Sequence, residues 1–170
     1  MGFVRVVGAT LMLMGMPAML SGCADMVAGM TKGVLDKALE DEPPVVEATI
    51  TAASDLNPDS TGNPNPIVFR FYELKALGSF NAADFFALYD QDAETLGQDM
   101  LARDEMTLLP GETREMKREL NMKTRYFGVI AAYRDLDNAT WRASVETPID
   151  ETIEVIINLD RLAVKIRHKE

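Results

Sequence analysis

Cysteine and histidine are almost missing from this sequence, which has one residue of each among its 170 residues. A single cysteine excludes an internal disulfide framework and any cysteine-based zinc cluster. The single histidine, His168, stands in a basic run with Lys165, Arg167 and Lys169 and is a poor partner for a catalytic nucleophile. We therefore expect a protein that is not an enzyme and that needs no metal or other cofactor.

Basic residues are also few, with 17 Lys and Arg against 27 Asp and Glu and a formal net charge of −10. This is the wrong sign for binding a phosphate backbone by counterion release, so no nucleic acid is expected as a partner. The many carboxylates do not single out a glycosidase pair, because such a pair is defined by its separation in space. Most of them are expected on solvated faces.

Residues 1–22 have the pattern of a secretory signal peptide. Arg5 is their only charged residue, and an apolar stretch follows from Val6 to Leu20. The stretch is short for spanning a bilayer, and its glycines and Pro17 argue against the alternative of a buried or spanning helix. It ends in Leu-Ser-Gly before Cys23, an order that resembles the lipobox of bacterial lipoproteins. The resemblance implies that Cys23 is acylated, becomes the first residue after cleavage, and anchors the chain permanently.

Residues 23–44 are expected to be a lipidated tether. Apolar residues recur at near-helical spacing up to the Pro43-Pro44 pair, while Gly29 and Gly33 weaken a helix. A helical tether and a helix lying on the membrane surface both remain open, although the acidic residues fit a membrane surface poorly.

Residues 45–170 predict a mainly β domain. Apolar and polar residues alternate with a period of two, for example over 46–52, 67–71, 139–146 and 162–166. Short strands separated by turn residues indicate an antiparallel β-sandwich of about eight strands. A helical stripe of aromatic residues predicts a helical insert at about 79–97. The apolar stretch Tyr126–Tyr133 predicts a central strand, with a bulge or a close backbone approach at Gly128.

Residues 54–66 form a long connection made almost entirely of turn formers. A loop of this length inside a compact domain is usually functional or disordered. Asp55, Asn57, Asp59 and Thr61 are spaced as in the first half of a calcium loop, but Ser60 stands where such a loop has Gly and the position of its bidentate Glu holds proline. We therefore expect no metal here.

Several stretches, taken together and in order, resemble the TssJ family of outer-membrane lipoproteins from type VI secretion systems. They are the lipobox ending at Cys23, Ala53–Asp59, Pro64–Lys75, Phe80 with Asp84–Tyr89, Leu108–Glu112, Tyr126–Asp137 and Trp141-Arg142. The resemblance implies a transthyretin-like β-sandwich with a small helical insert. It also implies a non-catalytic anchor that binds the periplasmic domain of the inner-membrane subunit TssM.

The resemblance also implies a location and a contact surface. Ala24 follows Cys23 where an Asp is the usual inner-membrane retention signal, so sorting to the outer membrane is implied. In the family the loop between the first two strands contacts the partner. Carried to this chain, the partner-binding residues are Asp55, Leu56, Asn57, Pro58, Asp59, Ser60, Thr61 and Gly62.

The loop composition predicts the chemistry of the partner surface, and one alternative function remains open. An acidic loop should seek Lys or Arg on its partner, with Leu56 as the apolar anchor. An alternative function is a periplasmic small-ligand carrier or binding module on a lipid anchor, which would need an apolar cavity of about 300 Å³ or more.

Overall fold

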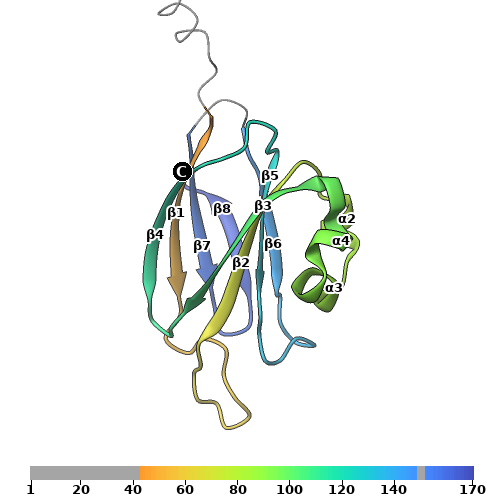
Figure 1. Ribbon diagram of the computed structural model, residues 1–170. Coiled ribbons are helices and arrows are strands. Elements are labelled where there is room, and N and C mark those ends of the chain that lie inside the picture. The colour runs from red at the N-terminus through yellow and green to blue at the C-terminus, as the bar shows by residue number, and fades with distance from the viewer. Residues whose placement is uncertain (1–42, 149–151) are drawn as a thin grey trace, which may run out of the picture. The chain divides into compact units, whose positions relative to one another are not determined.

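The computed structural model of the chain describes residues 43–148 and 152–170. These residues form two β-sheets packed face to face, with a group of short helices beside one of them (Figure 1). The predicted signal peptide, Cys23 and the tether up to residue 42 lie outside the described residues. Within the described residues, no helix has the length and apolar character needed to cross a membrane.

The described residues form eight strands in two sheets of four, here called sheet A and sheet B. Sheet A has the order β4-β1-β7-β8 and contains β1 (Val45–Ala52), β4 (Thr113–Glu119), β7 (Ile153–Leu159) and β8 (Val164–His168). Sheet B has the order β3-β2-β5-β6 and contains β2 (Ile67–Leu74), β3 (Met100–Leu108), β5 (Tyr126–Ala131) and β6 (Arg142–Glu146). The expected mainly β sandwich is confirmed, and β5 is central as predicted.

One pair of strands departs from the expected antiparallel arrangement. In sheet A, β1 pairs with β4 antiparallel but with β7 in parallel, from Val46 opposite Ile153 to Ala52 opposite Leu159. Alternation predicts which residues face inward but says nothing about the direction of a distant partner strand. The parallel pair joins segments about a hundred residues apart, so the sequence pattern could not reveal it.

The core lies between the two sheets. Val46, Ala48 and Ile50 of β1 alternate inward from sheet A, opposite Phe69 and Phe71 of sheet B, and all five are buried. The Phe71 ring also stacks on Phe127 with a centroid separation of 5.4 Å. Burying each large side chain contributes about 1.5–3 kcal/mol, so the alternating residues account for the pairing of the two sheets.

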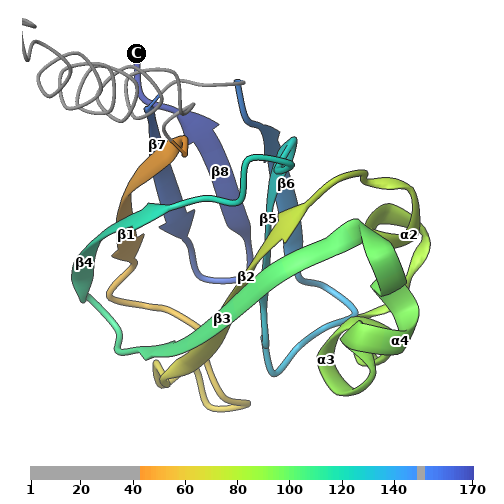
Figure 2. The ribbon, with the colours of Figure 1, turned by 45° about the horizontal axis from the view of Figure 1, so that its top comes forward.

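The helical insert covers the outer face of sheet B (Figure 2). It consists of α2 (Gly78–Ala82), α3 (Phe85–Asp90), α4 (Asp92–Leu96) and the 3-10 turn η1 (Gly97–Asp99). Phe80, Leu88 and Leu96 pack against outward-facing side chains of β2 and β5. A Cβ atom at Gly128 would lie 2.9 Å from the Phe80 ring, so the predicted close approach is confirmed.

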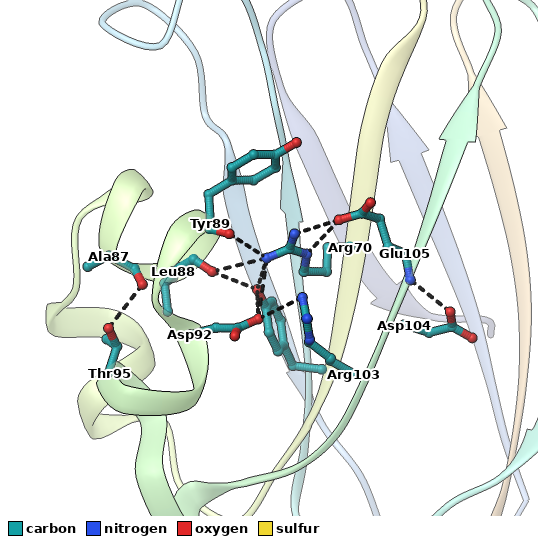
Figure 3. A network of polar contacts seen from close by, with 10 residues as sticks. Arg70, Ala87, Leu88, Tyr89, Asp92, Thr95, Arg103, Asp104 and Glu105 are labelled. Atoms are coloured by element: carbon teal, nitrogen blue, oxygen red, sulfur yellow. Dashed lines mark hydrogen bonds and ion pairs between the residues drawn. The ribbon is translucent and has the colours of Figure 1, made fainter.

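A buried arginine joins this insert to the sheet (Figure 3). Arg70 of β2 donates to Glu105 Oε2 of β3 (2.5 Å), to the Tyr89 carbonyl (2.9 Å) and to Asp92 Oδ2 (3.3 Å). The Tyr72 hydroxyl donates to the Leu88 carbonyl, and burial raises the pKa of Tyr72 to about 12. The insert is therefore fixed to sheet B by polar bonds as well as by apolar contacts.

Strand direction separates the two ends of the sandwich. The chain enters β1 beside Leu120, whose N–H donates to the Pro44 carbonyl at 2.7 Å, and we call this the entry end. Because β1 runs away from that point, the β1–β2 connection lies at the opposite end (Figure 1).

Arg70→Ala should lower the free energy of unfolding by about 3 kcal/mol, because it removes the buried cation beside the Asp92 carboxylate and the donor to the Tyr89 carbonyl. Arg103→Ala is the matched control, since half-exposed Arg103 pairs with the same carboxylate at 3.1 Å and should cost less than about 1 kcal/mol. Urea denaturation of the two variants measures the difference. Equal losses would contradict the role given to Arg70.

Candidate functional site

Four connections meet at one end of the sandwich, here called the loop end (Figure 1). They are residues 53–66, 109–112, 132–141 and 160–163. The Gly111 N–H donates to the Ala53 carbonyl at 3.1 Å, and the Tyr133 hydroxyl donates to the Asp160 carbonyl at 3.1 Å. Burial raises the pKa of Tyr133, so this hydroxyl remains a donor. The predicted partner-binding residues thus lie in a set of loops that are bonded to one another.

Leu56 does not serve as an exposed anchor. Its side chain is 0% exposed and belongs to the core between the sheets. The expectation that Leu56 contacts a partner is therefore wrong, because an apolar residue in a polar loop can equally point inward and fasten the loop. Leu109 in the neighbouring turn is instead 55% exposed and is the large apolar side chain available at this end.

Asn57 is the buried connection between the loops. Its side chain donates from Nδ2 to the Pro66 carbonyl (2.8 Å) and accepts from the Arg134 N–H at Oδ1 (2.8 Å). Its own N–H donates to the Arg161 carbonyl at 3.1 Å. The residue has a φ of 48°, in the left-handed region that asparagine tolerates better than most residues. One residue, through its side chain and its backbone, therefore fixes the base of the loop to two neighbouring connections.

Asp59 holds the tip of the loop. Its Oδ1 accepts from the Thr61 N–H (2.9 Å), the Thr61 hydroxyl (2.7 Å) and the Asn63 N–H (3.0 Å). These bonds lower the pKa of Asp59 to about 2. Gly62 completes the turn with a φ of 88°, and its N–H donates to the Asp59 carbonyl. The tip is thus a self-bonded turn, and its principal carboxylate is used internally.

Two of the remaining predicted residues, Pro58 and Ser60, line a surface cleft. The cleft has a volume of about 670 Å³ and is lined by Pro58, Asp59, Ser60, Arg134, Asp135, Arg161 and Leu162. Asp55 stands at its edge, with its carboxylate 3.9 Å from the Arg161 guanidinium. The loop end therefore offers a ready-formed tip, a polar cleft beside it and an exposed Leu109.

Sequence reasoning missed three of these side chains, namely Leu109, Arg134 and Arg161. Each lies in a connection that follows a strand predicted from the sequence. The signal that could have found them is antiparallel order, since connections after every second strand gather at the same end of a sandwich. The structure brings these residues to the predicted loop, while it withdraws Leu56 and the side chain of Asn57 from the surface.

Comparisons with known proteins agree with this architecture. Residues 44–162, more than half of the chain, match the family described as type VI secretion lipoprotein, VasD, EvfM, TssJ. Comparison with curated protein sequences gives no match.

Solved structures give the same result. The T6SS lipoprotein TssJ1 from Pseudomonas aeruginosa is 42% identical, with a TM-score of 0.73, covering 75% of this chain and 98% of that one. Serratia marcescens Lip, a membrane bound component of the type VI secretion system, is 29% identical, with a TM-score of 0.68 and coverage of 75% and 99%.

A chain in the structure of the T6SS protein TssM C-terminal domain from EAEC is 25% identical, with a TM-score of 0.60, covering 72% of this chain and 97% of that one. The family match covers residues 44–162. TssJ1 from Pseudomonas aeruginosa is 42% identical over three quarters of this chain. The chain therefore belongs to the type VI secretion lipoprotein family, the TssJ family.

Proposed function

We propose that the chain is a non-catalytic outer-membrane lipoprotein that anchors a type VI secretion membrane complex. In this role Cys23 carries the lipid, residues 23–44 form the tether, and the loop end binds the periplasmic domain of the inner-membrane subunit TssM. The observation that carries the proposal is the position of the self-bonded loop at the end of the sandwich opposite to Pro44, where the chain enters β1.

The separation of the two ends fits a bridging role. Strand β1 has eight residues, which corresponds to about 26 Å at the usual rise of a strand. A lipid attached before Pro43 keeps the entry end toward the outer membrane, so the loop end is directed into the periplasm. A partner anchored in the inner membrane would meet that end first.

The loop end also has the physical properties of a binding surface. Asn57 fixes the base of the loop and Asp59 fixes its tip, so little conformational entropy is lost when a partner docks. The exposed Leu109 side chain lies in the turn bonded to Ala53 and supplies the apolar contact first assigned to Leu56. Contacts through Asp55, Pro58, Ser60, Thr61 and Gly62 complete the proposed interface, with Leu56 and Asn57 supporting it from below.

The choice of partner rests on the relatives. This chain resembles one found in a structure of the TssM C-terminal domain, and TssM is therefore the partner to test first. The alternative of a small-ligand carrier has less support. The space between the sheets is filled by side chains such as Phe69, Phe71 and Ile157, and the loop-end cleft is lined by charged residues.

Cys23→Ser should leave the chain unprocessed and outside the outer-membrane fraction, because no other residue can form the thioether to diacylglycerol. Membrane fractionation in cells that lack the partner subunits measures this. Ala24→Asp is the matched control, since it keeps the cysteine and should move the lipoprotein to the inner membrane. Recovery of Cys23→Ser in the outer membrane would rule out lipid anchoring.

Replacing residues 58–63 by a Gly/Ser linker of equal length should weaken binding to the purified TssM periplasmic domain by at least about tenfold. Leu56 and Asn57 are retained, so the melting temperature should change by less than about 2 °C. The control is Met122→Ser with Lys123→Ser, an exposed pair in the β4–β5 connection at the entry end. If the linker variant bound as tightly as the control, the interface would lie elsewhere on the sandwich.

A further inference from the structure

We propose that the cleft beside the loop tip receives a carboxylate of the partner protein, held by the guanidinium groups of Arg134 and Arg161. This inference rests on the proposed function, because it describes the chemistry of the same interface. It reverses the charge expected from the sequence, where the acidic loop was expected to seek basic residues. The reversal follows from which polar side chains around the cleft already have hydrogen-bond partners within the domain.

The acidic groups around the cleft already have donors. Asp59 accepts from Thr61 and from both the backbone and the side chain of Asn63. Both oxygens of Asp135 accept from the Asn138 amide, at 2.9 and 3.0 Å. These carboxylates are committed to the turns that they stabilise. Their orientation is therefore set by bonds within the loops.

The guanidinium groups around the cleft, in contrast, have few acceptors. Within residues 43–148 and 152–170 the Arg134 guanidinium makes no hydrogen bond or ion pair, and the one carboxylate near Arg161 is that of Asp55 at 3.9 Å. Each guanidinium has five N–H donors arranged to bind a carboxylate at two points. A ligand that completes the cleft must therefore bring acceptors, and a carboxylate fits two neighbouring guanidinium groups.

The two arginines are positioned by the same residue. Asn57 accepts from the backbone N–H of Arg134 and donates to the backbone carbonyl of Arg161. Their Cα positions are thus fixed before a partner arrives, even though their side chains are exposed. Pro58 and Leu162 add apolar surface to the cleft walls, against which the methylene groups of a partner Asp or Glu can pack.

The location of the cleft favours a protein carboxylate over a lipid headgroup. The cleft lies at the loop end, whereas the chain enters the domain from its tether at the other end. The formal charge of the whole chain is −10, whereas the cleft lining has two Arg and two Asp side chains, so an acidic partner is repelled less at the cleft than over the rest of the surface. A difference of this kind favours one docking orientation over others.

The test compares binding of the mature lipidated chain in detergent to the purified TssM periplasmic domain. The double variant Arg134→Glu with Arg161→Glu should bind at least about tenfold more weakly than the parent chain. The double variant Arg134→Gln with Arg161→Gln removes the two positive charges without adding negative ones and should show a smaller loss. Arg167→Glu on β8 is the control, because among residues 43–148 and 152–170 its side chain bonds to nothing but the adjacent His168 carbonyl.

Two further measurements make the result specific. Raising the salt concentration should weaken binding of the parent chain more than that of the Gln variant, since the attraction is between charges. Among charge reversals of exposed Asp and Glu residues of the partner, one should restore binding to the Arg→Glu variant. Failure of every such reversal to restore binding would overturn the carboxylate assignment.

The outcomes separate the two proposals. If the parent chain does not bind the periplasmic domain, the proposed function itself fails. If the parent binds and both arginine variants bind within about twofold of it, the proposed function stands and this inference is overturned. A melting temperature for each variant equal to that of Arg167→Glu excludes unfolding as the cause of a loss.

Discussion

The buried side chain of Asn57 is the interaction on which the loop end depends. Without it, the β1–β2 connection would be held at its base by the buried Leu56 side chain and by the backbone bonds of Ala53 to Leu159 and Gly111. Its amide instead bonds to Pro66 on its own loop and to Arg134 on the next, while its backbone bonds to Arg161. A buried amide with both ends satisfied gives a geometry that apolar packing alone does not specify.

The sandwich core supports this arrangement from beneath. Leu56 belongs to the same buried cluster as Phe69 and Ile157, so the loop is continuous with the packing between the sheets. The Arg70 network plays a comparable part on the outer face of sheet B, where it attaches the helical insert. In both places apolar contacts bring two segments together and buried polar bonds determine how they meet.

Much of the fold could be predicted from the sequence, because burial on one face of a strand imposes a period of two. The strands, the insert and the close approach at Gly128 follow from local patterns of this kind. The parallel pairing of β1 with β7 could not be predicted, since it joins distant segments. For the same reason the loop was found, but Leu56 was expected to be exposed and is buried. The bonds from Asn57 to the backbone of Arg134 and Arg161 could not be predicted either, because they join connections that are distant in the sequence.

The position of β1 also matters for the proposed anchoring role, in which the domain is placed under tension. The tether precedes Val45 and the binding loop follows Ala52, so the two proposed points of attachment flank one strand. A pull between membrane and partner therefore acts along β1, which is paired with β4 on one side and β7 on the other. Bonds on both sides are then loaded in shear and must yield together. A strand loaded from one end of a hairpin would instead lose its bonds one at a time, so the order of tether, β1 and loop favours mechanical stability.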